Sequence, residues 1–199
     1  GVIASKDPII KLVKKQAEKG KPVLGICNGA QVLVETAMVP GVSDKVQMAL
    51  APNINPHISG YYCTWVGMKS VQKKGRTAFT KTYDEGELIP LPIAHGEGRF
   101  VTSDPEVMKQ LKKNGQIVFQ YCDYKKQVNT EFPWNPNGST DAIAAICNKE
   151  GNVMAIMPHP ERTFLKWQWP WMPEEWKNTL KASPWLRMFQ NARQWCDGK

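Results

Sequence analysis

The stretch that most constrains this chain is residues 21–31, an apolar run that ends at Cys27, which is set between Gly25 and Gly29. This pattern is typical of a nucleophile elbow, in which a strand delivers a reactive side chain to a sharp turn and a helix follows. The two glycines remove Cβ atoms that would block the turn and an approaching substrate. The helix N-terminus would favour the thiolate form of the cysteine. A buried structural cysteine is the alternative, and this stretch alone leaves both interpretations open.

The residues around the elbow predict helices on both sides of a strand. Apolar residues recur at helical spacing between Pro8 and Gly20, which are typical start and stop signals. Residues 23–26 then predict a strand, and residues 28–38 predict a second helix. This alternation favours an α/β fold with a mostly parallel sheet and helices on both of its faces.

Further along the chain, apolar runs alternate with segments rich in turn residues. Residues 48–59 read as a loop, and the polar residues 73–87 read as a surface excursion. A turn at residues 148–151 between two short apolar runs predicts a hairpin. The other expected elements are strands over 61–71, 88–94, 117–121, 142–147 and 152–157 and a helix over 103–113.

Composition narrows the class of protein. The chain has 199 residues and is 42% hydrophobic, which suffices for a sizeable core. Its formal charge is +8, but the lysines are spread along the chain rather than clustered, so we expect no nucleic acid partner. No apolar run is long enough to cross a bilayer, so we expect no membrane association. Five scattered cysteines without a C-x-x-C pair indicate neither a disulfide framework nor a zinc site and favour the cytoplasm.

A cysteine nucleophile needs a base, and the base needs an orienting group. The chain has three histidines, of which His57 lies in a loop between prolines and His95 follows a strand. His159 also follows a strand, lies between two prolines, and has Glu161 two residues on. On an extended segment, side chains two residues apart leave from the same side. Glu161 could therefore bind one imidazole nitrogen while the other faces the thiol of Cys27.

No cofactor site is evident in the sequence. A metal centre would need Cys and His at ligand spacing, and this chain has no such cluster, so we expect no metal. The chain also lacks the G-x-x-x-x-G-K-[ST] and G-x-G-x-x-G phosphate-binding patterns. Any ATP-driven step would therefore take place elsewhere.

Four motifs occur in an order that resembles a known family. They are Gly25-Ile-Cys-Asn-Gly29 with Gln31, Ile93-Ala-His-Gly-Glu-Gly-Arg99, Asn135-Pro-Asn-Gly-Ser139 and Met157-Pro-His-Pro-Glu-Arg162. Together they resemble the glutaminase part of the phosphoribosylformylglycinamidine synthases, which are triad-type (class I) glutamine amidotransferases of purine biosynthesis. The tail, from residue 167 to 193, is more similar to the large single-chain form of these enzymes than to the small separate subunit.

The resemblance implies hydrolysis of L-glutamine to glutamate and ammonia. Cys27 would attack the side-chain amide, His159 would donate a proton to the departing ammonia, and Glu161 would orient His159. The ammonia would pass to a synthetase module, fused or separate, in which ATP and Mg convert formylglycinamide ribonucleotide to formylglycinamidine ribonucleotide. The residues that the resemblance implies for glutamine binding are Gly25, Asn28, Gln31, His95, Gly96 and Glu97.

The resemblance also implies a fold and a division of the chain. We expect a flavodoxin-like class I glutamine amidotransferase sandwich that lacks its N-terminal strands, among them the strand whose loop supplies part of the oxyanion hole. Residues 1–161 would form the glutaminase core. Residues 162–199, which contain six of the eight tryptophans, would form a C-terminal extension that packs on the core or on a synthetase partner.

Two other functions remain open from the sequence. One is another cysteine hydrolase of flavodoxin-like fold, which shares the elbow but is not expected to carry the motif around His159. The other is a non-catalytic, truncated scaffold or regulatory fragment that keeps the motifs but lacks the oxyanion loop.

Overall fold

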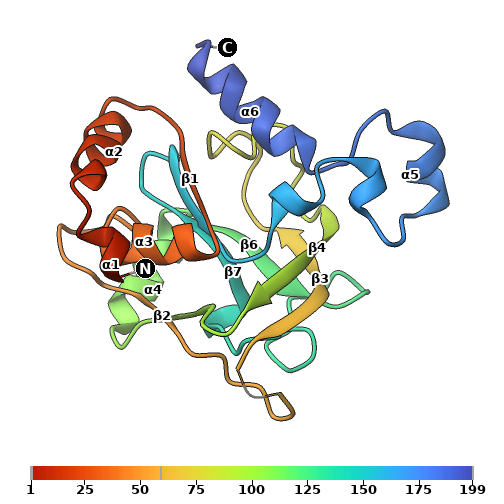
Figure 1. Ribbon diagram of the computed structural model, residues 1–199, viewed down its shortest axis with the longest axis horizontal. Coiled ribbons are helices and arrows are strands. Elements are labelled where there is room, and N and C mark those ends of the chain that lie inside the picture. Colours follow the sequence, from red (N-terminus) through yellow and green to blue (C-terminus); the bar gives the residue numbers. More distant parts are fainter. Residues whose placement is uncertain (1, 59, 199) are drawn as a thin grey trace.

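The computed structural model describes residues 2–58 and 60–198 and is built around a six-stranded sheet of order β1-β8-β7-β6-β3-β4 (Figure 1). A second, two-stranded sheet pairs β2 with β5. The helices are α1 (Val2–Ser5), α2 (Ile9–Glu18), α3 (Asn28–Glu35), α4 (Pro105–Lys113), α5 (Glu174–Thr179) and α6 (Leu186–Cys196). The strands are β1 (Val23–Ile26), β2 (Ala49–Ala51), β3 (Tyr62–Ser70), β4 (Leu88–His95), β5 (Arg99–Val101), β6 (Ile117–Cys122), β7 (Ile143–Cys147) and β8 (Val153–Ile156).

The direction of the strands corrects one expectation. The α/β class is confirmed, but within the described residues only β1 and β8 pair in parallel, and the other four pairings of the large sheet are antiparallel. The sheet is therefore mixed rather than mostly parallel. For β7 and β8, the cause is the length of the connection. The turn at 148–151 joins β7 to β8 directly, and parallel neighbours would need a crossover of a dozen residues or more.

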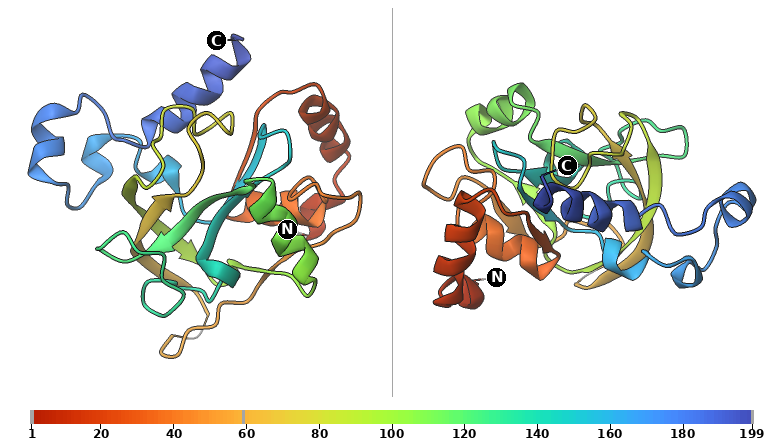
Figure 2. Two further views of the ribbon diagram at one scale, coloured as in Figure 1. Left: turned by 180° about the vertical axis from the view of Figure 1, so that it is seen from behind. Right: turned by 90° about the horizontal axis from the view of Figure 1, so that it is seen from above.

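Side chains of β8 alternate between two cores on opposite faces of the sheet. Val153 and Ala155 belong to a cluster with residues of α3 and α4, whereas Met154 and Ile156 belong to a cluster with Met188 of α6. This two-residue period is the one that a strand imposes. Helices therefore cover both faces of the sheet, as the views in Figure 2 show.

The C-terminal tail contributes to one of these cores. Trp185 is fully buried, and its ring lies 5.8 Å from that of Tyr83 and 5.6 Å from that of Phe119. Its Nε1 donates a hydrogen bond of 2.9 Å to the carbonyl of Pro90 in β4. In contrast, α5 has no buried residue and stands out from the body on the side opposite α1 and α2 (Figures 1 and 2). The division at residue 161 stays a prediction.

Two segments differ from the loops expected there. Residues 73–87 are irregular but not superficial, because Phe79 and Tyr83 are buried in the core. Hydrogen bonds join Thr77 to Thr80 within this segment, and its lysines are exposed. Within 48–59, β2 pairs antiparallel with β5. None of the helices in the described ranges is long and apolar enough to span a membrane.

Candidate active site

Cys27 lies at the junction between β1 and α3. Its backbone has φ 51° and ψ −106°, a region that residues other than glycine rarely adopt. Its N–H donates to the carbonyl of Ile156 at 2.9 Å, and its carbonyl accepts from the N–H of Gln31 at 3.2 Å. The strand on one side and the helix on the other therefore hold the strained turn in place. Backbone strain that is held in this way is typical of functional sites.

The two glycines beside Cys27 differ in what they allow. A Cβ on Gly25 would lie 2.5 Å from the carbonyl oxygen of Gly29 and 2.6 Å from Cδ1 of Leu33. Gly25 therefore lets β1 and α3 approach closely. A Cβ on Gly29 would meet nothing within 4 Å. Gly29 thus borders open space, and packing within the described chain does not require it.

His159 and Glu161 follow β8 in a short 3-10 turn, Pro160–Arg162. The N–H of His159 donates to the carbonyl of Pro92 in β4 at 2.9 Å, which fixes the turn against the sheet. Its Nδ1 lies 2.5 Å from Oε1 of Glu161. Its Nε2 is buried and has no hydrogen-bond partner among the described residues. The carboxylate therefore orients the ring and leaves Nε2 for another group.

The charges of this pair support each other. Burial favours the neutral imidazole, but the thiol of Cys27 and the carboxylate of Glu161 outweigh it and raise the pKa of His159 to about 9. Burial likewise opposes the charge on Glu161, yet the hydrogen bond from His159 lowers the pKa of this carboxyl. At neutral pH the pair is therefore ionised. The thiol of Cys27 also lies 3.7 Å from the carbonyl of Ala94 at the end of β4.

His95 is the second histidine near this pair. Its side chain is buried, and neither ring nitrogen has a partner among the described residues. Burial, reinforced by the charge of His159, lowers the pKa of His95 to about 4. A Cβ on Gly98 would lie 2.4 Å from Cε1 of this ring, so Gly98 leaves the space that the imidazole fills. His95 is therefore neutral at physiological pH.

Asn53 holds the turn that carries His95, and the sequence interpretation missed it. Its Nδ2 donates to the carbonyl of His95 at 2.8 Å, and its Oδ1 accepts from the N–H of Gly98 at 3.0 Å. Its own N–H donates to the carbonyl of Gly96 at 2.8 Å. The segment 48–59 contains several asparagines and prolines. Nothing in the sequence distinguishes this Asn from ordinary loop residues.

The motif at residues 135–139 packs against the same turn. Nδ2 of Asn137 donates to the carbonyl of Gly98 at 2.8 Å and to the hydroxyl of Tyr121 at 3.3 Å. The hydroxyl of Ser139 accepts from the N–H of Phe100 at 3.0 Å. Burial raises the pKa of Tyr121, and the nearby Cys27 adds to this effect. Asn137 and Tyr121 therefore support the turn that carries His95. The sequence motif indicated Asn137 but not Tyr121.

The structure also brings Gln31 and Glu97 together. Nε2 of Gln31 donates to the carbonyl of Glu97 at 2.9 Å, while Nδ2 of Asn28 donates to Oε1 of Gln31 at 3.2 Å. Glu97 itself is exposed. Gly96 borders a hollow of about 650 Å³. His57 lines this hollow too, but its ring packs against Phe132, with centroids 5.6 Å apart.

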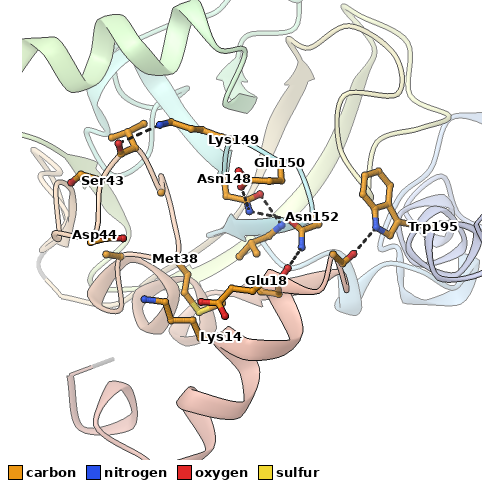
Figure 3. A pocket seen from close by; sticks show the side chains of 16 residues that line it. Lys14, Glu18, Met38, Ser43, Asp44, Asn148, Lys149, Glu150, Asn152 and Trp195 are labelled. Carbon is orange, nitrogen blue, oxygen red and sulfur yellow. Dashed lines mark hydrogen bonds between the residues drawn. The ribbon is translucent and has the colours of Figure 1, made fainter.

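A cavity of about 680 Å³ lies at a different place, between α2, the β7–β8 hairpin and Trp195 (Figure 3). None of the predicted site residues lines it. Two of its polar side chains hold the fold together. Nδ2 of Asn152 donates to the carbonyls of Ala17 and Lys21, and Nε1 of Trp195 donates to the carbonyl of Gly20. This cavity is therefore a poor candidate for the chemistry of Cys27.

Metal binding finds no support in the geometry. Within residues 2–58 and 60–198, no three or more His, Cys, Asp or Glu side chains gather as they would around a metal ion.

Comparison with known proteins indicates the family to which this chain belongs. Residues 2–196 match the family model of the CobB/CobQ-like glutamine amidotransferase domain. The phosphoribosylformylglycinamidine synthase subunit PurQ of Methanothrix thermoacetophila is 45% identical over 175 residues, which cover 85% of this chain and 66% of that protein. The same subunit of Methanocaldococcus jannaschii is 45% identical over 166 residues, 83% of this chain and 66% of that protein. The chain thus spans just under two thirds of the length of these relatives.

A much longer protein and a solved structure are also similar. The phosphoribosylformylglycinamidine synthase of Dictyostelium discoideum is 36% identical over 181 residues, which cover 87% of this chain but 13% of that protein. The solved structure of PurLQS from Thermotoga maritima is similar to this fold with a TM-score of 0.67 and 28% identity. The match covers 98% of this chain and 72% of that chain.

Proposed function

Because the chain belongs to the CobB/CobQ-like glutamine amidotransferase family, we propose that it hydrolyses L-glutamine to glutamate and ammonia with Cys27 as the nucleophile. One observation carries the proposal. Cys27 sits in a strained strand-to-helix turn beside His159, whose other ring nitrogen is bound by Glu161. A nucleophile, a base and an orienting carboxylate in this arrangement are the parts that acyl transfer requires.

The proposed reaction has two halves. The thiolate of Cys27 attacks the side-chain carbonyl carbon of glutamine, and the carbonyl oxygen takes the negative charge of the tetrahedral intermediate. As the C–N bond breaks, the imidazolium of His159 gives its proton to the leaving nitrogen, and ammonia and a glutamyl thioester result. Water then attacks the thioester, His159 accepts its proton, and glutamate leaves as the thiol forms again.

The oxyanion needs hydrogen-bond donors at the elbow. The N–H of Cys27 is already bound to Ile156, so it is committed to the sheet. Asn28 is the first residue of α3, and N–H groups in the first turn of a helix have no partner within the helix. We therefore propose the N–H of Asn28 as an oxyanion donor, an interaction worth roughly 3–4 kcal/mol in other acyl-transfer enzymes.

Glutamine would lie between the elbow and the turn after β4. The hydrogen bond from Gln31 to the carbonyl of Glu97 joins these two segments, and the strained turn of Cys27 lies next to Ala94 on the same strand end. The residues that we propose to hold the substrate are Gly25, Asn28, Gln31, His95, Gly96 and Glu97.

The ammonia would serve a second module. The relatives are named as PurQ subunits of phosphoribosylformylglycinamidine synthase, and one similar structure is titled PurLQS. We infer that this chain, too, delivers ammonia to a synthetase, fused or separate, in the cytoplasm. That synthetase would use ATP and Mg to convert formylglycinamide ribonucleotide to formylglycinamidine ribonucleotide in purine biosynthesis. Because ammonia released without this acceptor is wasted, we expect low glutaminase turnover in isolation and higher turnover after docking.

A glutaminase assay tests the proposal. Glutamate release is measured with and without the synthetase, for the unchanged chain and for Cys27→Ala. The matched control is Cys196→Ala, because Cys196 is an exposed thiol on α6, away from the elbow. We expect Cys27→Ala alone to abolish release. No release from the unchanged chain, even with synthetase, would instead favour a non-catalytic scaffold.

A labelling experiment separates glutaminase from other cysteine hydrolases. An electrophile that mimics glutamine should modify Cys27, as read by mass spectrometry of peptides, and excess glutamine should protect this residue. Labelling of Cys27 that glutamine does not slow would argue for a different substrate. Labelling of Cys63 or Cys196 at the same rate would show that the reagent reacts with any exposed thiol, since both of these thiols are exposed.

A further inference from the structure

A second cavity, of about 450 Å³, borders β3 and is rich in aromatic side chains. Its walls come from β3, the start of β4, the turn after β6, the segment 133–134 and the tail. None of its lining residues belongs to the proposed glutaminase site. We call it the aromatic groove, and its defining residues are Tyr62, Trp65, Tyr124, Trp134, Trp171 and Asp123.

Three of the groove's rings pack against other rings. Tyr124 and Trp134 stand almost perpendicular, at 83°, with centroids 4.6 Å apart. Trp65 packs against the buried Trp169 at 5.2 Å, and Nε1 of Trp169 is bound to the carbonyl of Thr163. These contacts orient Trp65, Tyr124 and Trp134 before any ligand arrives. Such preorganisation lowers the entropic cost of binding.

These aromatic side chains also leave much of their surface in water. Trp171 is 67% exposed, Tyr124 is 88% exposed and Trp65 is 36% exposed. Rings that contributed mainly to the core would be buried, as Trp185 is. Because exposed ring faces are unfavourable in water, their concentration around one cavity indicates a ligand.

The charge of the groove differs from that of the protein. The chain carries a formal charge of +8, yet none of the residues that line the groove is Lys or Arg, and Asp123 is the one charged residue among them. Oδ1 of Asp123 accepts from the N–H groups of Lys125 and Gln127, each at 2.9 Å, which fixes the carboxylate. Ring faces and a carboxylate both attract a cation.

We propose that the aromatic groove binds a small organic cation with a fully methylated ammonium group. The volume lies within the range of small-molecule sites, about 300–1,000 Å³. A primary ammonium brings three N–H donors that need three acceptors placed around one point. The side-chain acceptors of the lining are the hydroxyls of Tyr62, Thr64 and Tyr124 and the carboxylate of Asp123, which come from two separate segments. A quaternary ammonium has no donor to satisfy, and aromatic faces are its usual binding partners.

The test compares a cation with a neutral molecule of the same shape. Choline is titrated into the full chain by calorimetry, and 3,3-dimethyl-1-butanol, in which carbon replaces the ammonium nitrogen, serves as the control. We expect choline to bind about tenfold more tightly or better, because cation–π contacts and the carboxylate act only on the charge. Equal affinity for the two molecules would overturn the proposal. So would the absence of choline binding at a concentration of about 10 mM.

Substitutions assign the binding to this groove. Trp171→Ala and Asp123→Asn should each weaken choline binding by about fivefold or more. The asparagine keeps an oxygen for the N–H groups of Lys125 and Gln127, so the turn is preserved. Trp167→Ala is the matched control, because Trp167 is 79% exposed in the same tail but does not line the groove.

Folding and glutaminase activity are checked in parallel. All three variants should keep the circular dichroism spectrum and the glutamine turnover of the unchanged chain, because none of these residues touches the Cys27 site. If Trp167→Ala weakened choline binding as much as Trp171→Ala does, the cation would be binding elsewhere on the tail, and the assignment to the groove would be wrong.

Discussion

Nδ1 of His159 lies 2.5 Å from Oε1 of Glu161, and the two residues are joined by a single proline. This pair determines the protonation state of the imidazole. In the unfolded chain, where the pKa of histidine is about 6.5, the ring is charged only below that pH. Between about 6.5 and the raised pKa of about 9, it is charged in the folded chain because Cys27 and Glu161 stabilise the imidazolium against burial. The stabilisation is therefore complete below pH 6.5 and is lost as the pH rises through about 9.

Glu161→Gln should lower the pKa of His159 and slow glutamine hydrolysis. The amide keeps the shape of the side chain but removes its charge, and it can hold the wrong tautomer of the ring. By analogy with other triads, we expect turnover to fall by roughly 10²–10⁴-fold. The pKa is read by NMR titration of the imidazole, and turnover by glutamate release.

Glu175→Gln, on the exposed α5, is the control for Glu161→Gln and should change neither quantity. A pKa of His159 that stays near 9 in Glu161→Gln would show that Cys27 alone maintains the charge, and would contradict the orienting role that we propose for Glu161.

His95 should make stability depend on pH in the opposite direction. Burial lowers the pKa of His95 to about 4, so between pH 4 and 6.5 the unfolded chain binds a proton here that the folded chain does not. The free energy of unfolding should therefore rise with pH across this window, by up to about 1.4 kcal/mol per pH unit from this residue. Urea denaturation at several pH values, compared with His95→Asn, isolates the contribution. If the free energy of unfolding changed with pH in the same way in both proteins, burial would not lower the pKa of His95.

The backbone of Cys27 predicts a conflict between stability and activity. A side chain at φ 51° and ψ −106° costs roughly 1–3 kcal/mol, which glycine would avoid. Cys27→Gly and Cys27→Ala both lack the thiol and should be inactive. Cys27→Gly should nevertheless be the more stable of the two, by about 1 kcal/mol in urea denaturation. If the alanine variant is as stable as the glycine variant, the turn is not strained.

Gly25 and Gly29 should respond differently to alanine. In Gly25→Ala, the new Cβ would lie 2.5–2.7 Å from backbone atoms of Gly29, so β1 and α3 must separate. We expect a loss of about 1–3 kcal/mol in the free energy of unfolding. Gly29→Ala points its Cβ into open space within a helix, so stability should be unchanged or higher by up to about 1 kcal/mol. Thermal melts measure the stability of both variants. If Gly25→Ala and Gly29→Ala lost similar amounts of stability, the close packing of β1 on α3 at Gly25 would be contradicted.

Local patterns in the sequence predicted the elements around the site well. The strand Val23–Ile26 and the hairpin of β7 and β8 are confirmed, because alternating apolar residues and turn residues act over short distances. The expectation that the sheet is mostly parallel was wrong, since pairing depends on which distant segments meet. Phe79 was assigned to the surface for the same reason. Its polar neighbours dominate the local pattern, while its burial depends on distant segments such as the strand of Phe119 and the tail.

Only the site residues that stand in sequence motifs could be predicted. Cys27, His159 and Glu161 stand in recognisable patterns, and the fold brings them together. Asn53 could not be found in this way, because it acts through hydrogen bonds to backbone groups more than 40 residues away along the chain. Such contacts leave no spacing signal in one sequence.

Trp185 tests whether the tail belongs to the core or only rests on it. Its ring fills space between Tyr83 and Phe119, and Trp185→Ala should lower the free energy of unfolding by about 3–5 kcal/mol. Trp185→Phe keeps most of the ring but loses the hydrogen bond to Pro90, which should cost about 1 kcal/mol and leaves a variant that folds. Trp167→Ala, at an exposed position of the same tail, should change stability by less than about 0.5 kcal/mol. Equal, small effects at both positions in urea denaturation would mean that the sheet is stable without the tail, and the tail would then be a separate extension rather than part of the fold.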